Sequence, residues 1–153
     1  MLWCVFMGYQ RIVRLGDTDA AGVIYFTSLL SICHEAYEFR LQDLGLNLKD
    51  FLTNSLFVVP IIHAEIDFFK PLFWGDTVEV FLQPTLASES RFILDYSVSL
   101  VSQEQQLVAK AKTIHLCIDT ITRERRFLPE YFLDFIGLGQ NHVTDITKNT
   151  LIK

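Results

Sequence analysis

The sequence predicts an α+β fold in which a curved antiparallel sheet wraps around one long central helix. Apolar residues recur at steps of three and four between residues 30 and 44, which is the spacing of one buried helix face. Three segments after residue 76 alternate between apolar and polar residues and are joined by short links, as in an antiparallel meander. With 153 residues, 50% of them hydrophobic, the chain can fill a sizeable core, and we expect one domain over residues 1–153.

The first strand is predicted over residues 9–15, which are rich in β-branched and aromatic side chains. A polar turn follows at residues 16–22. The long helix comes next, with the hydroxyls of Thr27 and Ser28 as candidate N-caps and Gly45 at the position expected for the C-cap. Its buried stripe is predicted to consist of Leu30, Cys33, Tyr37, Leu41 and Leu44.

Strands dominate the chain after this helix. Residues 46–52 are expected to add a turn or two of helix, and residues 56–69 then form a β-rich run. Pro60 interrupts that run and cannot donate a ladder hydrogen bond, so we expect a bulge or a sheet edge there. The alternating strands cover residues 77–86, 91–101 and 107–118, and their apolar face must be covered by the helix.

The two ends of the chain carry weaker signals. A short helix is predicted over residues 129–136, with Pro129 at its first position. The pattern then becomes polar, so we expect a flexible tail over residues 137–153 and a core over about residues 8–136. Residues 1–7 lack the basic start, long apolar region and cleavage site of a signal peptide. If Met7 is the natural start, residues 1–6 do not belong to the natural protein.

Charge and cysteine content exclude several classes of function. The formal net charge of −5 argues against a nucleic-acid partner. Charged residues interrupt every apolar run before it is long enough to cross a bilayer, so we expect no membrane association. Cys4, Cys33 and Cys117 are odd in number and widely spaced, which argues against a disulfide framework or a zinc site. We therefore expect a cytoplasmic protein in a reducing compartment.

The turn before the helix holds the candidate chemistry. Asp17 and Asp19 would face the backbone N–H groups and the positive dipole end at the helix start, and a carboxylate opposite such donors is a candidate catalytic pair. Both side chains could instead only accept turn hydrogen bonds, or bind Mg²⁺ with further oxygen ligands from elsewhere. His34 and Glu38, one helical turn apart, are either metal ligands that lack a third partner or a polar pair facing a pocket.

The run GDTDAAGVIYF at residues 16–26, set between a strand and a long helix, resembles the hotdog-fold thioesterases of the 4-hydroxybenzoyl-CoA thioesterase type. The resemblance covers roughly residues 8–130. The runs CHEAYE at residues 33–38 and PIIHAEIDFF at residues 60–69 are similar to one branch of that family, whose acyl group is a bicyclic aromatic acid. The resemblance implies a hotdog fold and hydrolysis of an acyl-CoA, with CoA as part of the substrate and no separate cofactor.

The resemblance also implies roles for individual residues. Asp19 matches the catalytic carboxylate, Asp17 matches an acid that supports the loop, and the backbone N–H of Phe26 matches the donor that polarises the thioester carbonyl. The positions that match the acyl pocket are Tyr25, His34, Val59 and His63. Those that match the CoA phosphate site, with nearby arginines that could supplement it, are Ser88, Ser90, Arg91, Arg123, Arg125 and Arg126. The family's sites lie between subunits, which implies a homodimer or a homotetramer.

Several alternatives stay open at this level. Asp19 could attack the thioester carbonyl to form a mixed anhydride, or it could orient and deprotonate a water molecule. The acyl group could be the bicyclic aromatic acid, another aromatic acid or a fatty acid. The arginines between residues 123 and 126 could form a solvated loop rather than a phosphate site. A dimer that binds acyl-CoA without hydrolysing it is a further alternative, which the presence of Asp19 disfavours.

Overall fold

The computed structural model describes residues 8–102 and 104–137. In chain order its elements are β1 (Tyr9–Ile12), the 3-10 turn η1 (Leu15–Asp17), α1 (Phe26–Asp43), α2 (Leu48–Asn54), β2 (Phe57–Val58), β3 (Ile61–Phe68), β4 (Thr77–Ser88), β5 (Arg91–Leu100), β6 (Gln106–Leu116), β7 (Ile118–Asp119) and α3 (Glu130–Phe135). The predicted tail beyond residue 137 and residues 1–6 lie outside the described residues.

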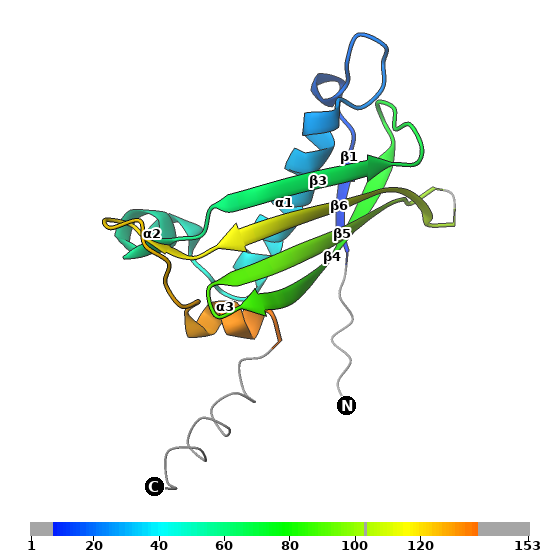
Figure 1. The fold of residues 1–153 in the computed structure, drawn as a ribbon. Helices are drawn as coiled ribbons and strands as arrows, with labels where there is room; N and C mark the ends of the chain where they lie inside the picture. Colours follow the sequence, from blue (N-terminus) through cyan, green and yellow to red (C-terminus); the bar gives the residue numbers. More distant parts are fainter. Residues whose placement is uncertain (1–7, 103, 138–153) are drawn as a thin grey trace, which may run out of the picture.

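The main sheet has five strands in the order β1-β4-β5-β6-β3, and all four neighbouring pairs are antiparallel. β4, β5 and β6 form the predicted meander. The long helix α1 crosses one face of this sheet (Figure 1). β2 and β7 form a separate two-stranded pair. The α+β fold predicted from the sequence, with a sheet around one long helix, is therefore confirmed.

The core lies between α1 and the inner face of the sheet. Every second residue of β5 points into it, as the alternation predicts, and these buried residues are Phe92, Leu94, Tyr96, Val98 and Leu100. From α1 the core receives Leu29, Ile32, Cys33, Ala36, Tyr37 and Leu41. The ring of Phe92 lies 5.4 Å from that of Phe132 in α3, so this short helix closes one end of the core.

The start of α1 differs from the prediction that Thr27 or Ser28 caps it. Tyr25 is the N-cap, and its side chain makes no capping hydrogen bond. The backbone fixes the start instead, because the N–H of Tyr25 donates to the carbonyl oxygen of Asp17 at 2.8 Å. A contact within the preceding turn thus takes the place of a hydroxyl cap.

The end of α1 follows the sequence signal. Gly45 has a φ of +84°, a conformation that glycine adopts without strain. Its N–H donates to Gln42, and the N–H of Leu46 donates to the carbonyl of Leu41, which is the Schellman arrangement. The predicted stripe is wrong at its last member, since Leu44 is 46% exposed where the helix leaves the core.

Several other boundaries also differ from the predicted ones, and three of these differences have a clear structural cause. β1 ends at Ile12 rather than residue 15, because η1 occupies the next residues. β6 ends at Leu116, and Ile118 pairs with β2 instead of continuing the strand. Pro129 is the N-cap of α3 rather than its first residue.

The predicted interruption at Pro60 is confirmed, because β2 ends before it and β3 begins after it. β3 lies at the edge of the main sheet, and its register with β6 shifts between Ile61 and His63. No helix among the described residues is long and apolar enough to span a membrane.

Candidate active site

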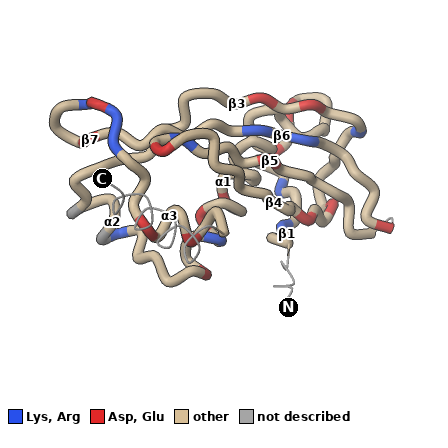
Figure 2. The backbone as a smooth tube through the Cα atoms, turned by 60° about the horizontal axis from the view of Figure 1, so that its bottom comes forward, with Lys and Arg blue, Asp and Glu red and all other residues tan. Residues whose placement is uncertain are grey.

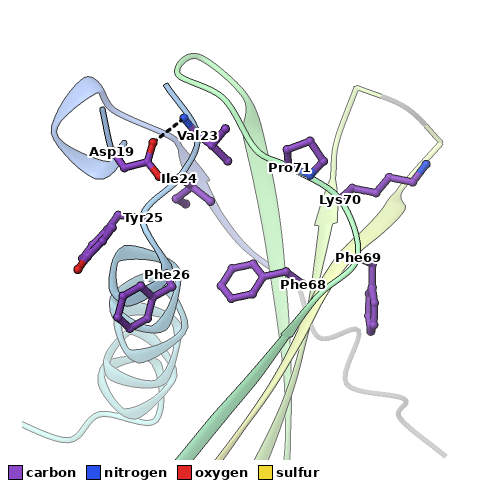
Figure 3. A pocket seen from close by; sticks show the side chains of 9 residues that line it. All are labelled: Asp19, Val23, Ile24, Tyr25, Phe26, Phe68, Phe69, Lys70 and Pro71. Atoms are coloured by element: carbon purple, nitrogen blue, oxygen red, sulfur yellow. Dashed lines mark hydrogen bonds between the residues drawn. The ribbon is translucent and has the colours of Figure 1, made fainter. Parts of the chain in front are cut away.

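A pocket of about 470 Å³ opens at the start of α1. The turn and the first helical residue form one side, and the end of β3 with the following loop forms the other (Figure 3). The lining residues are Asp19, Val23, Ile24, Tyr25, Phe26, Phe68, Phe69, Lys70 and Pro71. The structure therefore places the predicted catalytic residues Asp19 and Phe26, together with Tyr25, around one cavity.

Asp19 uses one carboxylate oxygen to build the turn. Its Oδ1 accepts the N–H of Ala21 at 2.8 Å and that of Val23 at 3.3 Å. The N–H of Asp19 donates to the carbonyl of Val23, and the N–H of Gly22 donates to the carbonyl of Asp19. Oδ2 accepts no hydrogen bond from any described residue. The turn-forming role considered from the sequence is present, and it leaves one oxygen for chemistry.

The helix start supplies hydrogen-bond donors to the same pocket. The N–H groups of Phe26 and Thr27 donate to no described residue, whereas that of Ser28 donates to the carbonyl of Tyr25 at 2.9 Å. The first N–H groups of any α-helix lack partners within the helix, and they carry the positive end of its dipole. The N–H of Phe26 is therefore available to an oxygen bound in the pocket.

Together these groups suit acyl transfer at a carbonyl carbon. A carboxylate can act as nucleophile or base, and free backbone N–H groups can stabilise the negative charge that grows on the carbonyl oxygen. The side chains of Phe26 and Phe68 lie on opposite sides of the pocket, and its walls are largely apolar (Figure 3).

The pocket wall opposite Asp19 was not predicted from the sequence. Phe68, Phe69, Lys70 and Pro71 are far from the turn in sequence and reach it only because β3 ends beside the helix start. One signal was present in the sequence, since Phe68 and Phe69 are consecutive aromatic residues that break the strand alternation. In the structure they are 44% and 52% exposed. Exposed aromatic residues next to a lysine are typical of a binding surface.

A groove runs along α1 beyond the pocket; we call it the α1 groove. It consists of two pockets, of about 390 and 360 Å³, that share the lining residues His34 and Glu38. One part reaches Ala64 of β3, and the other reaches Val59 and Arg123. Nε2 of His34 lies 3.3 Å from Oε1 of Glu38, and the described residues contain no group of three potential metal ligands. His34 and Val59 are thus brought together as a polar and an apolar wall of one groove.

His63 lies elsewhere. Its neighbour Ala64 pairs with the inward-facing Thr113, so the side chain of His63 points to the outer face of the sheet. There Nε2 lies 3.1 Å from Oε2 of Glu65, whose other oxygen is 3.6 Å from Lys112. Basic residues of β6 lie next to acidic ones of β3 along this face (Figure 2). Within one chain, His63 does not join the acyl pocket predicted for it.

The predicted CoA residues at the β4–β5 turn are also distant from Asp19 within one chain. Arg91 pairs with Leu116, whereas the pocket end of β6 is marked by Ala109, the partner of Phe68. Ser88 and Ser90 contact each other across the turn at 3.5 Å, and Nε of Arg91 is buried without a hydrogen-bond partner among the described residues. These residues therefore occupy the opposite end of the sheet.

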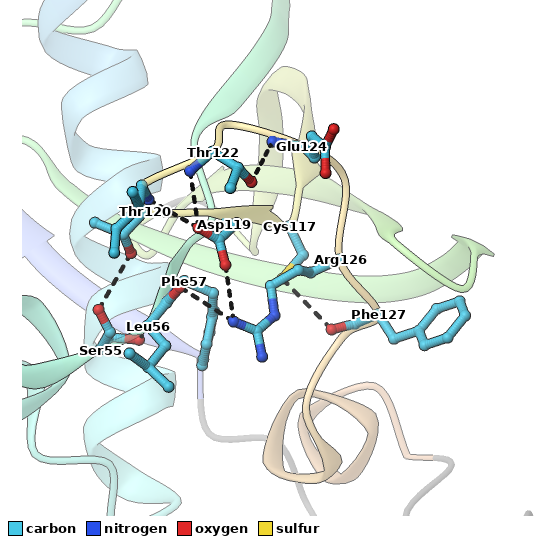
Figure 4. A network of polar contacts seen from close by, with 11 residues as sticks. Ser55, Leu56, Phe57, Cys117, Asp119, Thr120, Thr122, Glu124, Arg126 and Phe127 are labelled. Atoms are coloured by element: carbon cyan, nitrogen blue, oxygen red, sulfur yellow. Dashed lines mark hydrogen bonds and ion pairs between the residues drawn. The ribbon is translucent and has the colours of Figure 1, made fainter.

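The arginines of the 122–126 loop have different surroundings. Arg126 donates to Oδ2 of Asp119 at 3.1 Å and to the carbonyl of Leu56, so it holds the loop to the rest of the chain (Figure 4). Backbone N–H groups of the same loop lower the pKa of Asp119. Arg123 lines the α1 groove, and the backbone of Arg125 bridges to Ile118. Of the three predicted phosphate-binding arginines, Arg126 is the one engaged in an ion pair.

A sheet packed against one helix, with a carboxylate beside free N–H groups at the start of that helix, defines the hotdog thioesterase class. A family model described as the thioesterase-like superfamily matches residues 13–136. The chain belongs to this family, which confirms the resemblance read from residues 16–26. It is an acyl-CoA thioesterase of hotdog fold.

The chain is also similar to individual enzymes whose names state a substrate. A 1,4-dihydroxy-2-naphthoyl-CoA hydrolase of Rippkaea orientalis is 48% identical over 87% of this chain and 96% of its own length. The enzyme of the same name from Microcystis aeruginosa is 49% identical over 86% and 93%. Among solved structures, a 1,4-dihydroxy-2-naphthoyl-CoA thioesterase from Synechocystis matches with a TM-score of 0.81 and 42% identity, covering 86% of this chain and 95% of that one.

Proposed function

We propose that this protein hydrolyses 1,4-dihydroxy-2-naphthoyl-CoA to 1,4-dihydroxy-2-naphthoate and CoA, a step of phylloquinone biosynthesis. The observation that carries the chemistry is the pocket in which the free oxygen of Asp19 and the free N–H of Phe26 occur together. The likeness to hydrolases of that ester, at 48% identity over most of the chain, supports the choice of acyl group. The reaction uses water and residues of the site, so it requires no cofactor.

The geometry supports a simple sequence of steps. The thioester carbonyl oxygen accepts the N–H of Phe26, which polarises the carbonyl carbon. Asp19 then acts by one of two routes. It attacks that carbon and expels the CoA thiolate, and water hydrolyses the resulting anhydride, or it takes a proton from a water molecule that attacks directly. In both routes the C–S bond breaks, the acid is released and the thiolate takes up a proton.

A homodimer with sites at its interface fits the placement of the remaining residues. β3 is an edge strand with exposed apolar side chains, including Ile62 at 47% and Phe68 at 44%. Such an edge readily pairs with a second chain. Antiparallel pairing of two β3 strands would set the Ile61 end of one against the Phe68 end of the other. The α1 groove of the partner would then lie beside the Asp19 pocket.

This arrangement suggests how the substrate is held. The naphthoyl rings would lie between Phe26 and Phe68, with a ring hydroxyl within reach of His34 from the partner's groove. The CoA phosphates would meet Arg123 or the Ser88–Arg91 turn of the partner, since these lie at the opposite end of the sheet within one chain. Two such dimers could pair further into a tetramer.

A thiol-release assay over a panel of CoA esters tests the proposal. The wild-type protein should hydrolyse the dihydroxynaphthoyl ester with the highest kcat/KM of the panel. Asp19→Asn should lower kcat by at least about 10²-fold, the usual contribution of a general base. Asp43→Asn is the matched control, because Asp43 is a 58% exposed carboxylate at the other end of α1. It should retain wild-type activity.

The same panel distinguishes the alternatives. A higher kcat/KM for aliphatic esters would replace the aromatic acyl group with a fatty one, for which the apolar walls of the pocket are the supporting observation. Full activity in Asp19→Asn would remove Asp19 from the mechanism. Tight binding without any thiol release would indicate a protein that binds acyl-CoA without hydrolysing it.

A further inference from the structure

Arg11 is a nearly buried cation held between two carboxylates. Its side chain is 12% exposed. Nη1 donates to Oδ2 of Asp17 at 2.5 Å and Nη2 donates to Oδ1 at 3.2 Å, while Nε lies 2.9 Å from Oε2 of Glu35. The two-point contact with Asp17 is the planar geometry that arginine forms and lysine cannot. Tyr9 donates its hydroxyl to the same oxygen of Glu35 at 2.9 Å. Arg11 therefore joins β1, the turn and α1.

Asp17 extends this contact to the start of α1. Its Oδ2 also accepts the N–H of Arg14 at 2.7 Å, which fixes the first part of the turn. Its backbone carbonyl accepts the N–H of Tyr25 at 2.8 Å, which fixes the residue before the first helical one. The next N–H, that of Phe26, is the free donor of the pocket. The guanidinium that holds Asp17 thus also determines where the donor lies.

Arg11 influences the charge of Asp17 as well. Its hydrogen bonds lower the pKa of that carboxyl, and the backbone N–H of Arg14 acts in the same direction. The charged and titratable groups around Asp17 are Arg11 and Tyr9 from β1, Arg14 from the turn and Glu35 from α1. Without Arg11, the pKa of Asp17 would rise towards its ordinary value of 3.8. The contacts of ionised Asp17 would then be lost at a higher pH than in the wild type.

We propose that Arg11 is a positioning residue for thioester hydrolysis, which holds the turn carrying Asp19 in place against the free N–H groups at the start of α1. Arg11 does not line the pocket, so it acts through Asp17. Displacement of reacting groups by about 1 Å can cost about 10² in rate, so loss of the guanidinium should lower kcat more than it changes KM. The kinetic part of this inference rests on the proposed function.

The kinetic test compares Arg11→Met with wild type on the dihydroxynaphthoyl ester. We expect kcat to fall about 10- to 100-fold with KM changed by less than about 3-fold. The acid limb of the kcat profile should move to higher pH. Arg11→Lys keeps the charge without the two-point contact, so it should restore only part of kcat and only part of the acid limb.

Arg40→Met is the matched control, because Arg40 also forms an ion pair with an aspartate. Its Nη1 lies 2.7 Å from Oδ2 of Asp43, and both residues belong to α1. It should retain wild-type kcat and pH profile. Wild-type kcat in Arg11→Met, or an equal fall in Arg40→Met, would overturn the inference. If Arg11→Met does not fold, Arg11→Lys decides, and wild-type kcat in that variant overturns the inference.

A second readout does not depend on the substrate. Loss of the Arg11 contact should free the carbonyl of Asp17 to move, so the amide of Tyr25 should exchange at least about 10-fold faster by hydrogen–deuterium exchange. The amide of Val98 in β5 should be unchanged. Failure of the proposed function would appear as an inactive wild-type protein. Failure of this inference would appear as unchanged exchange at Tyr25.

Discussion

Nε2 of His115 lies 2.9 Å from the hydroxyl oxygen of Thr113, and that oxygen lies 3.3 Å from the hydroxyl of Tyr96. His115 is fully buried, and its ring stacks on Phe92 with centroids 4.5 Å apart. Burial lowers the pKa of His115 to about 4, because an imidazolium here would lose its water. His115 is therefore a neutral core residue at pH 7.

Lowering the pH from 7 to 5 should destabilise the fold through His115. Its folded pKa of about 4 lies below the ordinary value of 6.5, so the unfolded chain binds more protons between these values. The contribution to stability is complete above pH 6.5 and is lost as the pH falls towards 4. At pH 5 the loss is on the order of 2 kcal/mol, which urea unfolding at the two pH values would measure.

Two variants separate this effect from general acid sensitivity. His115→Gln lacks the titrating group, so its free energy of unfolding should change less between pH 7 and pH 5 than that of the wild type. Val98→Ala is the control, because it weakens the same core without removing a titratable group, and its pH dependence should match the wild type. An identical pH dependence in His115→Gln would contradict the assignment.

Substituting Gly22 should damage the turn that carries Asp19. Gly22 has a φ of +77°, and an added Cβ would meet no atom within 4 Å, so backbone strain is the whole cost. Gly22→Ala should lower the free energy of unfolding by about 1–2 kcal/mol and reduce kcat as Asp19 shifts. Gly16→Ala is the matched control in the same turn, with equal space and no positive φ. Thermal unfolding should place it within about 0.5 kcal/mol of the wild type, and equal losses in both would contradict the explanation.

Much of the fold was predictable because the signals are local. The alternation in β5 identified each of its buried apolar residues, although it placed the buried Ser99 on the polar side, and Pro60 and Gly45 marked element ends through their own backbone preferences. The start of α1 was not predictable, since it depends on the carbonyl of Asp17 rather than on a hydroxyl cap. The end of β6 likewise depends on whether Ile118 finds a different partner strand. Both are decided by tertiary contacts that no short window of sequence contains.

Part of the candidate site could also be predicted from the sequence, and part of it could not. Asp19 and Phe26 could be predicted because they lie within one motif next to a helix start. The opposite wall could not, because Phe68 and Lys70 approach only through the packing of β3 beside α1. The arginines between residues 123 and 126 suggested a phosphate site only through their number, and Arg126 forms an ion pair with Asp119. The sequence does not show whether a charged loop residue already forms an ion pair within the chain.

A proline in β3 should separate the proposed dimer. The backbone N–H of Phe69 donates to the carbonyl of Val108, so the odd-numbered residues of β3 direct their N–H groups to β6. The N–H of Ala64 therefore points to the free edge of the sheet. Ala64→Pro removes that edge donor while keeping the bonds to β6, so it should shift the protein from dimer to monomer. Ala64→Val keeps the N–H and should stay dimeric. Light scattering coupled to size exclusion measures both, and a dimeric Ala64→Pro variant would argue against pairing through β3.

Lys70 should assist the capture of the anionic substrate. It lines the pocket, and its ammonium points away from Asp19 towards the solvent (Figure 3). In this position it can attract the CoA phosphates without touching the reacting carbonyl, so Lys70→Gln should raise KM about 3-fold and leave kcat unchanged. Because salt screens exposed charges, the difference from wild type should shrink at about 0.5 M salt. Lys112→Gln, on the outer face of the sheet beside Glu65, is the matched control and should keep the wild-type KM. A fall in kcat at Lys70, or a KM effect that persists in high salt, would instead indicate direct contact with the reacting group.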